Sequence, residues 1–171
     1  MIYLISDTHF NHANMIEFCG RPADFEKKII KNLKNLHHDD ILIHLGDICI
    51  GRDVEAHKLL NEHCMAKRWL IKGNHDRQNY SWYMCRGWSV VAESMVLKLH
   101  NEKILLSHKP SPLYGNTLNI YGHFHNNPLK NCEAELTSIL TDRHLLFTLE
   151  HHYQPILLEK FISNSLTNLK K

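Results

Sequence analysis

The N-terminal half of the chain alternates short apolar runs with amphipathic segments. Apolar runs at residues 2–6, 41–45 and about 67–71 have the length and composition of buried strands. Segments 24–36 and about 54–65 carry apolar residues at the three- and four-residue spacing of an amphipathic helix. This β-α-β-α-β alternation predicts a largely parallel sheet whose strands are joined by crossover helices.

Polar side chains follow each of these predicted strands. Asp7, His9, Asp47, Asn74 and His75 all stand at or just beyond the end of an apolar run. In open α/β sheets, ligand-binding groups gather beyond the carboxyl ends of the strands. We therefore expect these five side chains to be neighbours in space.

The tetrapeptide Gly73-Asn74-His75-Asp76 carries the densest set of polar side chains. Glycine permits a tight turn with positive φ, which would aim the following side chains away from the strand end. Asparagine and histidine can bind a hard or borderline metal ion, and an aspartate can orient an imidazole. Taken alone, the tetrapeptide could equally be an ordinary turn.

The second half of the chain has short apolar runs with few long helices between them. These runs predict the strands of a second, more antiparallel sheet packed on the first, at residues 90–91, 95–99, 104–106, 118–121 and 145–149. Ser107-His108 ends one run, and Gly122-His123-Phe124-His125 ends another. The polar stretch Lys130–Arg143 could belong to an insertion, a strand pair or a dimer contact, and the polar tail from Ser163 is expected to fray.

Length and composition limit the class of protein. A chain of 171 residues fits one domain, here residues 1–171, and a hydrophobic content of 43% with 22% charged residues is ordinary for a soluble globular protein. A formal charge of +2 is too small to argue for a membrane or a nucleic acid as partner. No apolar stretch approaches the roughly 20 residues that span a bilayer.

The cysteines indicate a cytoplasmic protein, and the number of histidines indicates a polar site. The five cysteines are odd in number and lack a C-x-x-C pair, which indicates reduced thiols in the cytoplasm, and the N-terminus shows no secretion signal. Fifteen histidines exceed what packing requires. Their positions relative to the predicted strands indicate which histidines lie together at one site.

The polar strand ends form an ordered set. They are Asp7-x-His9, Gly46-Asp47, Gly73-Asn74-His75-Asp76, His108 and Gly122-His123-x-His125. Over roughly residues 2–125 this set resembles the motif series of the calcineurin-like metallophosphoesterases. Ser6-Asp7-Thr8-His9-Phe10 and the residues that follow also look like a small prokaryotic and phage branch of that family. The resemblance implies an α/β four-layer αββα sandwich, two mixed β-sheets face to face with helices outside.

The donor types predict the metal chemistry. Carboxylate, amide and imidazole donors without a thiolate suit Mn, with Fe, Zn, Ni or Co as alternatives. Seven ligand residues exceed what one tetrahedral ion can use, so we expect two divalent ions. By resemblance, one ion would be held by Asp7, His9, Asp47 and His125. The second would be held by Asp47, Asn74, His108 and His123, with Asp47 bridging.

The resemblance also implies roles at the reacting phosphate. A metal-bound hydroxide would attack phosphorus, and His75 would contact the phosphoryl group or protonate the departing alkoxide, with Asp76 a candidate to orient it. His12, Asn74 and Arg77 are candidate substrate-binding residues. His12 could instead order its loop, and Asp76 could simply cap a turn.

Further arginines and aromatic residues follow the motif loops. Arg21 and Arg52, like Arg77, could grip a phosphate or merely face solvent. The aromatic residues Tyr80, Trp82 and Tyr83 could stack a nucleobase, or could pack the helix of that region.

Hydrolysis of a small phosphate ester is the function we expect, with phosphodiesters favoured by analogy and a nucleotide as one possible substrate. Residues 46–52 lack the G-D-x-x-D-R-G pattern of phosphoprotein phosphatases that share this fold, which argues against protein phosphatase activity. The alternatives are a phosphomonoesterase at the same site, a non-catalytic interaction module of the same fold, and a nuclease within a larger assembly. The last would need a basic stripe that the sequence lacks, so we expect no stable binding of nucleic acid. The sequence leaves the oligomeric state open.

Overall fold

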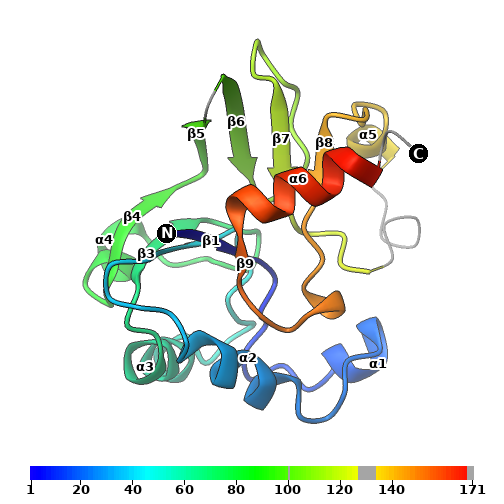
Figure 1. Ribbon diagram of the computed structural model, residues 1–171. Coiled ribbons are helices and arrows are strands. Elements are labelled where there is room, and N and C mark those ends of the chain that lie inside the picture. The colour runs from blue at the N-terminus through cyan, green and yellow to red at the C-terminus, as the bar shows by residue number, and fades with distance from the viewer. Residues whose placement is uncertain (100, 127–133, 169–171) are drawn as a thin grey trace.

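Two mixed β-sheets with flanking helices make up the computed structural model, which describes residues 1–99, 101–126 and 134–168 (Figure 1). The strands of the first sheet are β1 Ile2–Ile5, β2 Ile41–His44, β3 Lys67–Ile71, β4 Trp88–Ala92 and β9 Ile156–Leu157. They lie in the order β4-β3-β2-β1-β9. The first four are parallel, and the edge strand β9 runs antiparallel to β1. The predicted β-α-β-α-β alternation is confirmed.

The second sheet is less antiparallel than predicted. Its strands are β5 Ser94–Leu99, β6 Glu102–Ser107, β7 Leu118–Tyr121 and β8 His144–Leu146, in the order β5-β6-β7-β8. Only β5 and β6 pair antiparallel, because a short turn joins them, whereas β6, β7 and β8 are parallel neighbours with longer connections. The last predicted strand stops at Leu146, and a 3-10 turn, η1 Leu149–His151, follows it.

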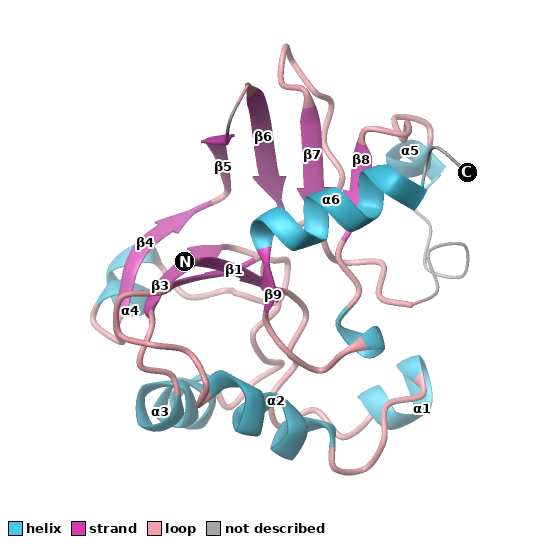
Figure 2. Ribbon diagram, viewed as in Figure 1, coloured by secondary structure: helices cyan, strands magenta, loops and turns pink. Residues whose placement is uncertain are grey.

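The run at residues 90–91 was predicted for the second sheet, and this was wrong. It lies in β4, which pairs in parallel with β3 at the edge of the first sheet. The reason is α4 Tyr80–Met84, which connects β3 to β4 and returns the chain to the same sheet as a crossover would. Glu93 alone separates β4 from β5, so the chain passes directly from one sheet to the other (Figure 2).

Amphipathic helices flank the sheets. Helix α2, Phe25–Leu33, buries Phe25, Ile29 and Leu33 at four-residue spacing, and it lies beside α3, Asp53–His63, below the first sheet in Figure 1. The shorter helices are α1 Met15–Cys19 and α5 Ala134–Thr137. Within the polar stretch 130–143, residues 130–133 lie outside the described residues and 134–137 form α5. No helix in the described parts of the chain is long and apolar enough to cross a membrane.

The tail does not fray where predicted. Helix α6, Leu158–Asn168, continues past Ser163 because Phe161, Ile162 and Leu166 pack against the core. It contacts β9 and β1. Apolar anchors every three or four residues therefore outweigh the polar composition of this segment.

The central strands of the first sheet contribute mainly apolar side chains to the core. Leu4, Ile5, Leu42 and Ile43 are fully buried, as expected for parallel strands covered on both faces. The polar side chains at the carboxyl ends lie just beyond this core. Backbone hydrogen bonds join the strand ends directly, for example from the Asp7 amide to the Gly46 carbonyl at 2.9 Å.

Candidate metal centre

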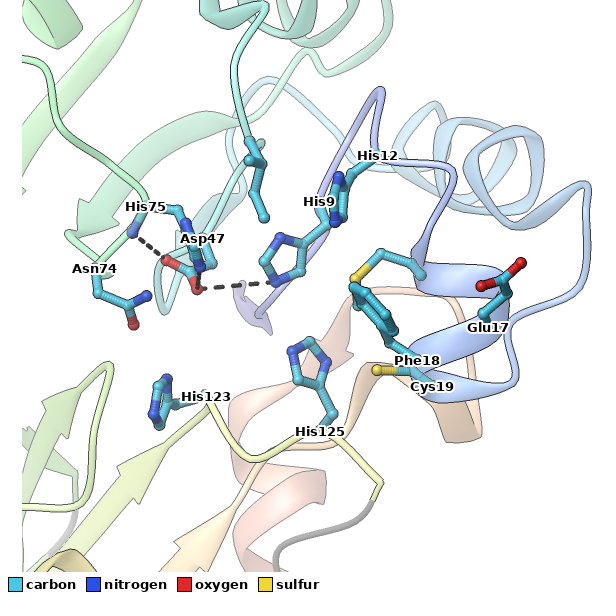
Figure 3. A pocket seen from close by; sticks show the side chains of 12 residues that line it. His9, His12, Glu17, Phe18, Cys19, Asp47, Asn74, His75, His123 and His125 are labelled. Carbon is cyan, nitrogen blue, oxygen red and sulfur yellow. Dashed lines mark hydrogen bonds and ion pairs between the residues drawn. The ribbon is translucent and has the colours of Figure 1, made fainter. Parts of the chain in front are cut away.

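The seven expected ligand residues come together at five strand ends. Asp7 and His9 follow β1, Asp47 follows β2, Asn74 follows β3, His108 follows β6, and His123 and His125 follow β7. Two groups of donors form, and in each group the donor atoms lie within 4.8 Å of one another. These groups are Asp7 with His9 and His125, and Asp47 with His108 and His123. A pocket of about 550 Å³ opens over them (Figure 3).

Asp47 stands between the two groups. Its Oδ2 atom lies 3.8 Å from His9 Nε2 and 3.3 Å from His108 Nε2. The Asn74 side-chain oxygen is 3.1 Å from His108 Nε2. The Asn74 amide therefore lies beside the donor group of Asp47, His108 and His123. One carboxylate oxygen near histidines of both groups is the geometry that a bridging ligand requires.

His9 provides the test of whether the residues present fit a metal ion. Its side chain is 3% exposed, and neither ring nitrogen has a hydrogen-bond partner. Burial lowers the pKa of His9 well below its ordinary value, so the ring is neutral and its lone pair is free to bind an ion. Since a buried, unpaired polar atom is costly, a cation at this position would satisfy a ring that the protein itself leaves without a partner. The residues fit a metal.

The protonation states of the other titratable side chains at the site depend on whether an ion is bound. Without one, burial lowers the pKa of His108, but the hydrogen bond and charge of Asp47 outweigh it and raise that pKa to about 9. Burial likewise opposes protonation of His125, but hydrogen bonds with Cys19 and Glu150 raise its pKa to about 10. For Asp47, burial favours the neutral acid, yet the hydrogen bond from His108 holds the pKa well below its usual range. Ligand histidines must lose these protons to bind an ion, so binding would release protons.

The ligand residues themselves make the sharp turns at the strand ends. Five of the nine non-glycine residues with positive φ in the described parts of the chain are expected ligands: Asp7 (52°), His9 (46°), Asp47 (59°), His123 (69°) and His125 (53°). A left-handed backbone costs a non-glycine residue roughly 1–3 kcal/mol and persists only where the surroundings impose it. Its concentration here indicates a site whose shape the fold imposes against local preference.

Gly73 is required for a different reason than predicted. Positive φ was expected there, but among the two loop glycines only Gly46 has it, with φ 99°. Gly73 instead allows close packing, because a Cβ at this position would collide with the Asp47 carboxylate. A Cβ on Gly46 would lie 2.6 Å from the Gly73 amide nitrogen and from His108 Nδ1. The two glycines let the loops after β2 and β3 touch.

Asp76 does not orient His75 as was expected. Its Oδ2 atom accepts hydrogen bonds from the Asp47 and Gly73 amides, both at 2.8 Å, and its Oδ1 atom accepts one from the Ile48 amide at 3.1 Å. The carboxylate is buried, and burial, with the nearby Asp47 charge, raises its pKa to about 6. Asp76 therefore fixes the loop that carries Asp47. Its contacts explain why an aspartate stands three residues after Gly73.

His75 and His12 both line the pocket beside the ligand set. The His75 side chain is 32% exposed, its amide donates to Asp47 Oδ1 at 2.9 Å, and its ring lies 5.7 Å from that of His9. The His12 ring lies 6.1 Å from that of His9. Burial, and then the charges of His75 and Arg21, lower the pKa of His12, so it can offer a hydrogen bond but no positive charge at neutral pH.

Three other predicted contacts are not found at the pocket. Arg77 and Arg52 are exposed and are not among the described residues that line it. Trp82 and Tyr83 pack together instead: Tyr83 is fully buried, and the Trp82 ring lies 3.6 Å from the Arg86 guanidinium carbon. The packing alternative therefore holds for Trp82 and Tyr83, whereas Tyr80 is 44% exposed and donates a hydrogen bond to Glu93.

Sequence reasoning missed the role of Arg21 and the presence of Glu150. Arg21 is 1% exposed, and its guanidinium donates to Glu150 Oε1 at 2.9 and 2.5 Å and to the Asp7 and Thr8 carbonyls at 2.7 and 3.1 Å. The same Glu150 oxygen lies 3.0 Å from His125 Nδ1. Burial would raise the pKa of Glu150, but the His125 hydrogen bond and the Arg21 charge lower it to about 2. No local motif marks Glu150, so only the tertiary structure reveals it.

This network places a carboxylate behind a ligand histidine. A hydrogen bond from Nδ1 fixes the ring orientation and leaves Nε2 for the ion. Cys19 forms a further donor group with His125 and Glu150, but the Arg21 guanidinium beside Glu150 disfavours a cation there.

Comparisons with known proteins agree with this geometry. A sequence model of the calcineurin-like phosphoesterase superfamily domain matches residues 1–141. An uncharacterized protein of Methanocaldococcus jannaschii is 37% identical over 140 residues, which cover 75% of this chain and 71% of the relative. The crystal structure of a protein of unknown function from Aquifex aeolicus superimposes with a TM-score of 0.75 at 26% identity, covering 96% of this chain and 98% of that one. All seven expected ligand residues lie within the matched span 1–141, and Glu150 lies beyond it.

Proposed function

Because the chain belongs to the calcineurin-like phosphoesterase superfamily, we propose that it hydrolyses phosphate esters, phosphodiesters above all, at a centre of two divalent metal ions. One observation carries the proposal. Two donor groups meet at the Asp47 carboxylate beneath an open pocket, and His75 stands on the pocket wall.

The donor set supports two ions held by this chain. Asp7, His9 and His125 would hold one, His108, His123 and Asn74 the other, and Asp47 would serve both. Two such ions would offset the charge of the phosphoryl oxygens and lower the pKa of a bound water. Oxygen and imidazole donors favour Mn²⁺, with Fe, Zn, Ni and Co as alternatives.

His75 is the side chain best placed to handle a proton. Its amide is held by the Asp47 carboxylate, which anchors the backbone, while the ring remains one-third exposed in the pocket. An imidazole that faces bound ester can donate a hydrogen bond to the phosphoryl group or give its proton to the departing alkoxide.

The charge of the pocket favours a diester over a monoester. No lysine or arginine is among the described residues that line it, and Glu17 adds a negative charge at its edge. A phosphodiester carries one negative charge and a monoester up to two, so the diester needs less added positive charge from side chains. The monoesterase alternative has one point in its favour: Lys72 and Lys109 line a neighbouring pocket that shares Asn74 with this one and is also lined by His108.

The first experiment measures turnover of paired chromogenic esters, bis(p-nitrophenyl) phosphate and p-nitrophenyl phosphate. The protein is stripped of metal and reloaded with Mn²⁺, and His75→Ala is compared with His63→Ala, a control on α3 that is not among the described residues lining this pocket. We expect metal-dependent turnover of the diester, and a loss of roughly 10²–10⁴-fold in kcat for His75→Ala alone.

Other outcomes change the conclusion in defined ways. Preference for the monoester would keep the site and replace the substrate class. Metal binding without turnover of either ester would refute the hydrolase proposal and favour a non-catalytic interaction module.

A further inference from the structure

The pocket over the metal centre has two chemically different walls. One part of the lining carries the expected metal-ligand side chains, and another part comes from α1 and the loop after β2, with Met15, Phe18 and Ile50. Figure 3 shows Phe18 across the pocket from Asn74 and His123. This second wall has no part in holding an ion, so its composition bears on what else the pocket takes.

Phe18 is exposed without a packing reason. Helix α1 buries Met15 and Cys19 against the core, but the Phe18 side chain, between them in sequence, is 64% exposed. Its ring lies 6.3 Å from that of His12, which lies 6.1 Å from that of His9. Three rings therefore lead from the expected ligand set to the pocket edge. Exposed apolar surface that lines a pocket is a mark of ligand contact.

We propose that this wall binds an aromatic ring in one ester arm of the substrate, as in a nucleoside phosphate, with Phe18 as the stacking residue. The proposal rests on the proposed function, because it places the phosphate at the metal centre. A sugar arm would gain less, since Met15, Phe18 and Ile50 offer no side-chain hydrogen-bond group to hydroxyls. An arm with further phosphates would meet Glu17 on the same helix.

Stacking predicts a measurable preference. Contact of one base with one aromatic side chain changes affinity by roughly 5- to 150-fold. The arrangement also predicts that the gain belongs to the ring of the ligand and not to its phosphate, because phosphate and ring would contact opposite walls.

The test compares two ligands that differ only in the ring, adenosine 5′-monophosphate and ribose 5-phosphate. Their binding to the Mn²⁺-loaded protein is measured by calorimetry, which needs no turnover. The variants are Phe18→Leu, which keeps apolar bulk, Phe18→Ala, and the control Tyr114→Leu. Tyr114 is an aromatic residue that is 84% exposed and is not among the described residues lining this pocket. Thermal unfolding checks that each variant is folded, which an exposed side chain should allow.

We expect the wild type to bind the nucleotide about tenfold more tightly than the sugar phosphate. Both Phe18 variants should lose most of this ratio through weaker nucleotide binding, while Tyr114→Leu keeps it. Equal binding of the two ligands by the wild type, or a ratio that survives Phe18→Ala, would overturn the inference and leave the proposed function standing. Failure of both ligands to bind would overturn the inference, and turnover of bis(p-nitrophenyl) phosphate would decide the proposed function separately.

Discussion

Replacement of Glu150 tests how the metal centre is held together. The Glu150 carboxylate is 4% exposed and lies between the guanidinium of Arg21 and the Nδ1 atom of His125. Arg21 in turn donates hydrogen bonds to the carbonyls of Asp7 and Thr8. The Glu150 carboxylate is therefore linked to His125 directly and to the backbone of Asp7 through Arg21, and both residues belong to the same expected donor group. We expect loss of Glu150 to weaken metal binding although Glu150 is assigned to neither ion.

The magnitudes follow from the contacts. Glu150→Ala strands a fully buried guanidinium, and breaking a buried ion pair by removing one partner costs about 3–5 kcal/mol of unfolding free energy. Glu150→Gln keeps the volume and one acceptor oxygen but turns charge-assisted hydrogen bonds into neutral ones, which costs about 1–2 kcal/mol. Loss of the partner behind a ligand histidine lowers metal affinity by roughly 10–100-fold.

Two measurements separate stability from metal binding. Urea unfolding of the metal-free protein gives the first quantity, and calorimetric titration with Mn²⁺ gives the second. Glu55→Ala and Glu55→Gln are matched controls, because Glu55 is exposed on α3, away from the pocket. Both controls should bind Mn²⁺ as the wild type does.

The Mn²⁺ affinities of the two Glu150 variants, compared with that of the wild type, decide whether Glu150 supports metal binding. We expect Mn²⁺ affinity to fall in Glu150→Ala and to be largely restored in Glu150→Gln, since the amide oxygen can still accept from His125 Nδ1. A folded Glu150→Ala protein with wild-type Mn²⁺ affinity would refute the reasoning, and Glu150 would then serve only to pair Arg21.

Three further predictions concern other parts of the structure. Asp76→Asn should lower Mn²⁺ affinity at least fivefold in a calorimetric titration, because an amide supplies only one acceptor oxygen where the carboxylate serves three backbone donors; the exposed Asp142→Asn should leave affinity unchanged. Gly122→Ala should lower Mn²⁺ affinity more than tenfold, because the new Cβ would collide with the Asp7 carboxylate; Gly115→Ala, with nothing within 4 Å, loses stability through its left-handed backbone but should bind Mn²⁺ normally. His57 is 1% exposed, and burial, with the charges of the neighbouring Arg68 and Arg86, lowers its pKa to about 4 despite the opposing contacts with Asp53. The folded state thus resists a proton that the unfolded state takes up near its ordinary value of 6.5, so stability is full above that pH and about 3 kcal/mol is lost as the pH falls to 4. Urea unfolding of wild type and His57→Leu across this range should show a loss that is about 3 kcal/mol larger in the wild type, and parallel pH profiles would refute the assignment.

Much of the fold was predictable because its signals are local. Apolar runs of strand length, each ending in polar residues, predicted β1, β2 and β3, and the carboxyl ends of parallel strands must meet at one edge of a sheet. The same rule predicted that the ligand residues would be neighbours, which the distances around Asp47 bear out. The pairing of β4 could not be read in this way, since a short apolar run fits the edge of either sheet.

Other features exist only through contacts between distant segments. Asp76 looked like a partner for the preceding side chain, His75, but two of its three hydrogen bonds come from a loop 28 and 29 positions away in sequence. Arg21 looked like an exposed phosphate ligand, and its partner Glu150 lies 129 positions away. The residues that neighbour Asp76 and Arg21 in sequence do not reveal that these side chains are buried, or which distant groups they bind.

By itself, then, the sequence determined the family resemblance, the order of the strands that carry the expected ligands and the kinds of donor atoms at the candidate site, because spacing and residue type are local properties. The tertiary structure alone decided that Asp76 fixes the loop that carries Asp47, that Glu150 and Arg21 stand behind His125, and that Phe18 stands exposed across the pocket. These depend on how separate elements pack. Packing is set by the whole chain at once.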